Sequence, residues 1–224
     1  MMALIDGLIS YYKLDEASGS IIDAHGSNDG TYTGALYSQS GKIGTSIGFD
    51  GTNDNIDLNF GSGTTLYSGF SVSFWAKPTD YTSDKYGAIW ASATSDHRFY
   101  IGNYSSKWDF SIATHGIGEG TGQATASNEW THIVAVINGA SAILYVNGVS
   151  TVTWSDIDSG FTLAQDIFIG STTGLWDGLI DEVGIWNKSL TSDEVTLLRN
   201  GGDGLAYPFT EDPVPIKIFD VRFG

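Results

Sequence analysis

The stretch Phe70–Pro78, FSVSFWAKP, decides the fold class of this chain. Its Phe, Val, Phe and Ala residues recur at every second position, so they share one face of a β-strand, and the Ser, Ser, Trp and Lys residues share the other. Pro78 ends the strand because proline has no N–H to donate to a neighbouring strand. The stretch predicts a strand with one core-facing side, and Trp75 on the serine side is predicted to be half exposed.

A second strand, Trp130–Ile137, is apolar on both faces apart from His132. This pattern predicts a place in the middle of a sheet with both faces covered, and we interpret His132 as a hydrogen-bonded core residue. Asn138-Gly139 and Asn147-Gly148 follow apolar runs. Each pair predicts a type I′ turn, because both central residues of that turn need a positive φ, so three strands are expected to form a meander.

A capping box predicts one short helix near the C-terminus. In Thr191–Glu194, the threonine oxygen can accept a hydrogen bond from the third amide of the helix while the glutamate reaches back. Gly201 marks the expected end, which gives about ten residues. We expect this helix to plug one end of the fold.

The composition points to an all-β protein. The 224 residues include 29 glycines, 13% are aromatic, and aspartate outnumbers glutamate by 20 to 6. Turn formers between short aromatic and β-branched runs indicate many strands. The absence of cysteine excludes disulfides, thiolate metal sites and cysteine nucleophiles. We therefore predict a two-sheet antiparallel β-sandwich with one short C-terminal helix.

The charge limits the partners. A formal net charge of −16 repels phosphate backbones and anionic membrane surfaces, so we expect no nucleic-acid partner. Because no run approaches the roughly 18 apolar residues of a bilayer span, we expect no membrane insertion. Met1–Asp6 has neither the basic nor the apolar region of a signal peptide.

We expect one domain over residues 1–208, followed by a proline-containing linker and a strand-like tail over residues 209–224. Pro213 and Pro215 favour an extended linker, and Ile216–Phe223 after them is strand-like. The tail could pair with a sheet edge of another copy or a partner, which would give a homo-oligomer or an assembly contact. The alternative is a last strand in its own domain.

Five stretches, in order and spacing, resemble the laminin-G-like domains of the concanavalin A-like lectin/glucanase jelly-roll superfamily. They lie within residues 7–208 and are Tyr11–Asp23, Gly41–Asp54, Phe70–Pro78, Trp130–Gly148 and Ile169–Leu190. The resemblance implies a jelly roll of about 12–14 strands. Members of the family bind glycans, proteins or other ligands, and many display or attach larger assemblies.

The resemblance also implies a structural calcium ion. In the family, the loop after the first strand and the aspartate of a Gly-x-Ile-Asp-Glu block can hold calcium. Here this implies Asp23, Asn28 and Asp181 with loop carbonyls, and such oxygen ligands suit Ca²⁺. The alternative is that Asp23 forms an Asx turn and Asp181 caps loop amides.

Alternation along two further predicted strands places four candidate ligand-binding residues on one polar sheet face. They are Arg98, Tyr100, Tyr104 and Asp109. The alternative is an ordinary solvated face. Trp154 and Trp176 lie near predicted loop tips and are candidate contacts at the rim of such a site.

We expect no enzyme activity. Glycan hydrolysis needs two facing carboxyl groups about 5–9 Å apart, whereas Asp181 and Glu182 are neighbours that should point to opposite faces of a strand. His97 and His115 are interpreted as loop residues, and neither a nucleophile elbow nor a zinc-type spacing occurs.

The prediction from the sequence is a non-enzymatic binding or display module. We expect it to recognise carbohydrate, or a protein on a cell or virion surface, and to work outside the cell or on a virion. One alternative is a structural decoration or assembly protein without a small ligand. A second alternative is an atypical glycan hydrolase.

Overall fold

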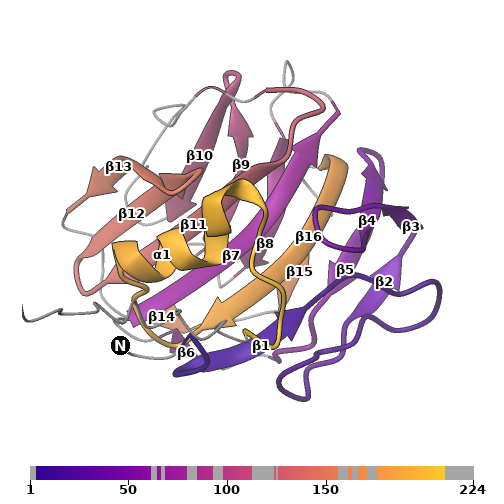
Figure 1. The fold of residues 1–224 in the computed structure, drawn as a ribbon, viewed down its shortest axis with the longest axis horizontal. Helices are drawn as coiled ribbons and strands as arrows, with labels where there is room; N and C mark the ends of the chain where they lie inside the picture. The colour runs from indigo at the N-terminus through magenta and orange to yellow at the C-terminus, as the bar shows by residue number, and fades with distance from the viewer. Residues whose placement is uncertain are drawn as a thin grey trace, which may run out of the picture.

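The computed structural model describes residues 4–61, 65–66, 69–79, 85–92, 98–112, 124, 126–155, 161–162, 166–170 and 176–209. Two antiparallel sheets stack face to face, and one helix lies over the larger sheet (Figure 1). No helix among the described segments has the length and apolarity that a bilayer crossing requires.

Eight strands form the larger sheet. In order across the sheet they are β13 (Val149–Trp154), β12 (Ser141–Val146), β11 (Thr131–Asn138), β7 (Gly69–Pro78), β16 (Asp177–Trp186), β4 (Thr45–Asp50) and β3 (Leu36–Ser40), and β1 (Leu8–Tyr12) also pairs with β16. The predicted strand Phe70–Pro78 is confirmed as β7, between β11 and β16.

Six strands form the smaller sheet. Their order is β10 (Lys107–Ile112), β9 (Arg98–Tyr104), β8 (Lys85–Ser92), β15 (Ile167–Ile169), β5 (Asn55–Asp57) and β2 (Thr31–Thr33). A separate pair joins β14 (Phe161–Thr162) and β6 (Thr65–Leu66). The described part has sixteen strands rather than the expected 12–14, and this two-residue pair accounts for the excess.

The main core lies between the two sheets. Phe70, Val72 and Phe74 enter it from β7, and Ile89 and Ile101 enter it from β8 and β9; each is at most 3% exposed. These side chains are the apolar positions of the alternating pattern, so the pleat buries one face of each strand. The predicted two-sheet antiparallel sandwich is confirmed.

A second apolar layer covers the outer face of the larger sheet. Helix α1 (Ser192–Arg199) lies over this face (Figure 1), and its Val195 and Leu198 share an apolar cluster with Val134 and Tyr145 of the sheet. The prediction that β11 is covered on both faces is confirmed. The prediction that the helix plugs one end of the fold is wrong, because the apolar outer side chains of β11 need a cover.

Trp75 is buried, whereas the sequence predicted that it would be half exposed. Only 4% of it is exposed, because its ring lies 5.0 Å from the His132 ring and under Lys42, whose Nζ is 4.7 Å from the ring centroid. The alternation of side chains along β7 is confirmed. The residues that cover the outer face of the sheet lie elsewhere in the chain, so the sequence of β7 alone could not predict that Trp75 is covered.

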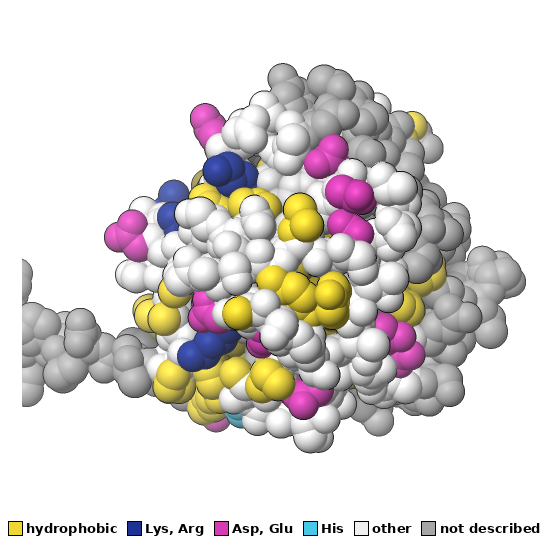
Figure 2. All heavy atoms as spheres, turned by 90° about the vertical axis from the view of Figure 1, so that its right-hand side faces the viewer, with side chains coloured by type: hydrophobic (Ala, Val, Ile, Leu, Met, Phe, Trp, Pro, Cys, Tyr) yellow, Lys and Arg dark blue, Asp and Glu magenta, His cyan; other side chains and the backbone are white. Residues whose placement is uncertain are grey.

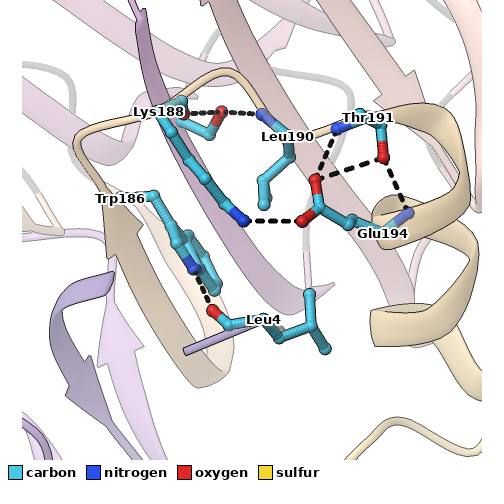
Figure 3. Close-up of polar contacts among 7 residues, drawn as sticks. Leu4, Trp186, Lys188, Leu190, Thr191 and Glu194 are labelled. Carbon is cyan, nitrogen blue, oxygen red and sulfur yellow. Dashed lines mark hydrogen bonds and ion pairs between the residues drawn. The ribbon is translucent and has the colours of Figure 1, made fainter. Parts of the chain in front are cut away.

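Hydrogen bonds tie the segment before α1 to the larger sheet (Figure 3). The Ser71 hydroxyl donates to the Lys188 carbonyl at 2.8 Å and accepts from the Leu190 N–H at 2.9 Å. The Trp186 indole N–H donates to the Leu4 carbonyl at 2.7 Å. A polar residue on the outer face of β7 therefore holds the chain that leads into the helix.

The predicted capping box is confirmed at the start of α1 (Figure 3). The Glu194 N–H donates to Thr191 Oγ1 at 3.3 Å, and the Thr191 N–H donates to Glu194 Oε2 at 2.9 Å. Glu194 also accepts from Lys188 Nζ at 2.6 Å. Burial raises the pKa of Glu194, but its hydrogen bonds to Lys188 and Thr191 lower it more, so the carboxyl stays charged.

The two predicted hairpins form, with one change of turn. Asn147 and Gly148 have φ values of 52° and 81°, as a type I′ turn requires. In the first hairpin Asn138 pairs with Ser141, so the central residues are Gly139 and Ala140 and the type I′ assignment to Asn138-Gly139 is wrong.

His132 is confirmed as a hydrogen-bonded core residue. It is 1% exposed, and its Nε2 lies 2.9 Å from Ser73 Oγ. Burial lowers the pKa of His132 to about 3, so its ring is neutral near pH 7.

The described chain ends against the second apolar layer. The Phe209 ring lies 5.2 Å from the Tyr11 ring and 6.4 Å from the Trp186 ring. Residues 210–224 lie outside the described part, so the predicted linker and strand-like tail, and their pairing with another copy, stay predictions.

We expect Glu194→Ala to lower the free energy of unfolding by about 1–2 kcal/mol, because it removes both the capping partner and the Lys188 ion pair. Urea denaturation measures the change. Asp193→Ala, an exposed residue in the same turn, is the matched control, with an expected loss of about 0.5 kcal/mol or less. Equal losses in the two variants would contradict this role of Glu194.

Candidate ligand-binding face

The outer face of the smaller sheet carries a row of aromatic side chains. The cross-strand register places Tyr100 of β9 opposite Trp90 of β8, and Trp90 opposite Phe168 of β15. All three side chains are partly exposed. The row continues through Asp57 of β5 to Thr31 of β2, so it crosses five strands.

Strand alternation puts this row on the outside. Ile89, Ile101 and Ile169, which adjoin the three aromatic residues along their strands, are fully buried in the core. Because successive side chains point to opposite faces, their aromatic neighbours point outward. The rings of Trp90 and Phe168 lie 5.6 Å apart at 49°, so they offer apolar surface in two orientations.

Two carboxyl groups adjoin the Phe168 end of the row. The Asp57 carboxyl accepts from the Asn59 N–H at 2.9 Å, and the Asp166 carboxyl accepts from the Gly61 N–H. Burial raises the pKa of Asp57, the hydrogen bond from the Asn59 N–H lowers it, and the charge of nearby Asp166 raises it, with a net rise above its usual value. Aromatic surface and hydrogen-bonding carboxyl groups therefore meet at one place.

The structure places the predicted ligand-binding residues on this same sheet. Tyr100 and Tyr104 lie on β9 and are partly exposed, and Asp109 faces Gly102 across the β9–β10 pair. Asp109 is only 1% exposed, so the expectation that it lies open on a polar face is wrong. Arg98 belongs to β9, but its side chain lies outside the described part. Ligand binding by these four residues stays a prediction.

Sequence reasoning missed Trp90, Phe168, Asp57 and Asp166. Their strands were recognised, and Ile167-Phe168-Ile169 on its own places the aromatic ring opposite two isoleucines. What the sequence did not contain is the order of strands, which joins residues 57, 90, 100 and 168.

The two tryptophans predicted at the rim of the site are structural. Trp176 is 1% exposed, and its ring stacks on Trp108 at 5.7 Å. Trp154 is partly buried and meets Phe110 edge to face at 5.8 Å. The prediction that Trp176 lies exposed near a loop tip is wrong, because it closes the core between the sheets. His97 and His115 lie outside the described residues.

Asp23 and Asn28, two of the predicted calcium ligands, lie together in one turn. The Asp23 carboxyl accepts from the N–H groups of Tyr11 at 3.0 Å, His25 at 3.1 Å, Gly26 at 2.8 Å and Asn28 at 3.1 Å. Burial raises the pKa of Asp23, and these hydrogen bonds lower it below its usual range. Oδ1 accepts three of these bonds and Oδ2 accepts one, so most acceptor positions of the carboxylate are taken, which favours the Asx-turn alternative.

Asp181, the third predicted ligand, caps a different loop. It is fully buried, and its carboxyl accepts from the N–H groups of Lys42 at 2.7 Å, Ile43 at 3.0 Å and Glu182 at 3.0 Å. These N–H groups occupy the lone-pair positions of the Asp181 carboxyl that a cation would need, so Asp181 fits a metal ligand poorly. Among the described residues no group of three or more His, Asp or Glu side chains could hold a metal ion. Calcium binding stays a prediction.

Glu182 sits in a β-bulge of β16 with a φ of 52° and accepts a hydrogen bond from the Tyr11 hydroxyl. The bulge breaks the strict alternation of the strand, so the expectation that Asp181 and Glu182 point to opposite faces does not hold here. Burial raises the pKa of Asp181 to about 8 and that of Glu182 to about 7.

One edge of the sandwich exposes apolar side chains. Figure 2 faces the side on which β2 and β3 lie in Figure 1, and it shows apolar groups gathered among acidic ones. Ile22 is 49% exposed and Leu36 is 55% exposed. The Tyr32 and Tyr37 rings meet at 4.5 Å beside these strands. We assign no ligand to this edge.

The two stacked antiparallel sheets define a jelly-roll sandwich. Residues 50–196 match a laminin-G-like family model described as the concanavalin A-like lectin/glucanases superfamily, and the chain belongs to this family. No curated protein sequence matches the chain.

Solved structures share the fold. Domain 4 of AbnA, a GH43 extracellular arabinanase from Geobacillus stearothermophilus in complex with arabinotriose, is 23% identical with a TM-score of 0.72, covering 84% of this chain and 96% of that one. Trypanosoma rangeli sialidase in complex with the inhibitor DANA is 13% identical with a TM-score of 0.67, covering 88% of this chain but 32% of the sialidase. The chain thus spans about a third of the sialidase.

The raised pKa values of Asp181 and Glu182 predict that stability falls as pH rises from about 5 to about 8. In the unfolded chain these carboxyls release their protons near pH 4, whereas the folded state keeps them until about pH 7 to 8. The folded state therefore binds more protons in this window, and the free energy of unfolding decreases with pH. His132, whose pKa burial lowers to about 3, acts in the opposite direction below about pH 6.5, so we expect a net decrease of roughly 2–5 kcal/mol in urea denaturation.

Glu182→Gln should flatten part of this pH dependence, because it removes one of the two titrating groups. Asp193→Asn is the control and should leave the slope unchanged. A pH dependence that is the same in Glu182→Gln and the wild type would show that the Glu182 carboxyl is already charged in the folded protein across this range.

Proposed function

We propose that this protein is a non-catalytic carbohydrate-binding module that holds a glycan on the outer face of the smaller sheet. The observation that carries the proposal is the row of Tyr100, Trp90 and Phe168, with the Asp57 and Asp166 carboxyls at its end. Rigid aromatic surface with a few polar groups at its edge is the usual composition of a small-ligand site.

The chemistry of the face suits a sugar. The C–H groups of a pyranose or furanose ring form an apolar patch with a weak positive charge, which packs on the negative face of an aromatic ring. The sugar hydroxyls donate hydrogen bonds to carboxyl oxygens, and such charge-assisted bonds are the stronger ones. AbnA domain 4, which has the same fold, was solved with arabinotriose, and this supports a glycan as the ligand class.

A binding role is favoured over hydrolysis. The Asp57 carboxyl accepts from the Asn59 N–H and the Asp166 carboxyl accepts from the Gly61 N–H, which suits fixed hydrogen-bond acceptors better than a general acid that must carry a proton. The Asp54 carboxyl likewise accepts from the Asp50 N–H at 2.9 Å. Among the described residues these pairs suit hydrogen bonding to hydroxyls better than acid–base catalysis.

Display on a cell or virion surface is part of this proposal. A module that binds glycans outside the cell would need such a setting, and a tail over residues 209–224 could attach it to a partner or to another copy. An assembly protein without a small ligand is the rival. Deleting residues 210–224 separates the two, since glycan binding should survive and any tail-dependent oligomer should be lost.

We expect Trp90→Ala to weaken glycan binding at least tenfold, about 1.4 kcal/mol, because it removes the central ring of the row. The wild type is first screened on a glycan array, and its strongest oligosaccharide is then titrated by calorimetry into wild type and variant. Tyr37→Ala, an aromatic truncation on β3 of the other sheet, is the matched control and should bind normally.

Two results would refute this site. One is an array on which the folded wild type binds nothing, which would favour the assembly protein. The other is a glycan whose affinity is equal in Trp90→Ala and the wild type, which would move binding elsewhere on the molecule.

Calcium titration of EDTA-treated protein tests the predicted ion at Asp23, Asn28 and Asp181. Because N–H donors occupy the Asp23 oxygens, a cation would have to displace them, and binding would appear as heat and a higher melting temperature. Neither heat nor a shift would leave Asp23 as a turn-forming residue. Asp23→Asn, which keeps an acceptor oxygen, should abolish any heat that comes from this site.

A further inference from the structure

We infer that the face accepts uncharged glycans and rejects glycans that carry carboxylate groups. This inference rests on the proposed function and names the substrate class of the same site. It is drawn from the charges that surround the aromatic row.

Acidic groups dominate the described charged side chains of this face. Asp57 and Asp166 stand at the Phe168 end of the row, whereas Asp109 points to the same side of β10 but is only 1% exposed, so it offers no surface to a ligand. Lys107 is the one described cationic side chain on the face, by its place two residues before Asp109. It lies on the edge strand β10, four strand spacings or about 19 Å from the strand β5 that carries Asp57, so it does not neutralise the acidic end of the row.

Other described cationic side chains are engaged on the far side of the molecule. Lys42 covers the Trp75 ring, Lys188 pairs with Glu194, and Lys13 lies 6.0 Å from the centre of the Tyr207 ring. In Figure 2 acidic side chains are spread across the surface, whereas the few basic ones lie toward the left. They are therefore not placed to neutralise a ligand carboxylate at the aromatic row.

The charge of the whole chain acts in the same direction. A formal net charge of −16 gives a negative potential around the protein, which lowers the local concentration of anionic ligands and slows their association. A neutral sugar experiences neither effect. Its hydroxyls can donate to the Asp57 and Asp166 carboxyls, whereas a ligand carboxylate has no proton to donate and repels them.

Two matched pairs of probes test the inference by calorimetry at low and high salt. One pair is oligogalacturonate with and without methyl esters, and the other is 3′-sialyllactose and lactose. For whichever neutral member binds, we expect its anionic counterpart to bind at least tenfold more weakly at 20 mM salt. The gap should narrow at 500 mM salt because salt screens the repulsion.

A double variant, Asp57→Asn with Asp166→Asn, provides the structural control. It keeps hydrogen-bonding groups but removes the charge, so the gap between the two members of a pair should shrink several-fold. Asp193→Asn, on α1, changes the net charge by one without touching the face and should leave the gap nearly unchanged. A gap that is the same in the double variant and the wild type would overturn the inference.

The outcomes separate the two proposals. An anionic probe that binds as tightly as its neutral partner, with binding lost in Trp90→Ala, would overturn the inference and leave the proposed face intact. If Arg98→Ala also abolished that binding, Arg98 would be the cationic group that binds the carboxylate of the probe. If neither pair nor any array glycan binds, or if Trp90→Ala has no effect, the proposed function fails and the inference fails with it.

Discussion

The central strands of the larger sheet, β7 and β11, are buried on both faces, and this constraint determines the rest of the structure. The inner face of the sheet meets the smaller sheet, and its outer face lies under α1 and the ends of the described chain. Polar groups on the outer face must then find partners within the protein, because a buried polar group without a hydrogen bond is costly. Ser71 and Ser73 meet this requirement by bonding to the chain before α1 and to His132. Within the described structure, the sheet face left for a ligand is that of the smaller sheet.

The outer faces of the two sheets differ in how far their aromatic side chains are exposed. On the larger sheet, the Trp75 and Trp186 rings are covered, and the Trp186 indole N–H donates a hydrogen bond to the Leu4 carbonyl, so they stabilise the fold. On the smaller sheet, Trp90 and Phe168 stay partly exposed, although burying them would stabilise the domain. Partly exposed rings beside two carboxyl groups, one of which has a raised pKa, support the proposed binding role.

Much of the fold could be predicted from local patterns. Alternation identified β7, the double apolar face identified the covered position of β11, and Thr191 with Glu194 identified the start of α1. These features depend on neighbours in the sequence. The helix position and the burial of Trp75 and Asp109 depend on segments far away in the chain, which no local pattern contains. The aromatic row could not be predicted for the same reason, because it depends on the order of strands across the smaller sheet.

The last strand of the domain, β16, lies in the middle of the larger sheet, where it pairs with β7, β4 and β1. Leu8 meets Trp186, so the first and last strands join across almost the whole chain. Contacts between such distant residues form slowly, because a long loop must close first. During synthesis on the ribosome, the nascent chain would therefore hold an incomplete sheet with open strand edges until its final strand emerges, and a chain broken before Asp177 would lack the centre of its own framework.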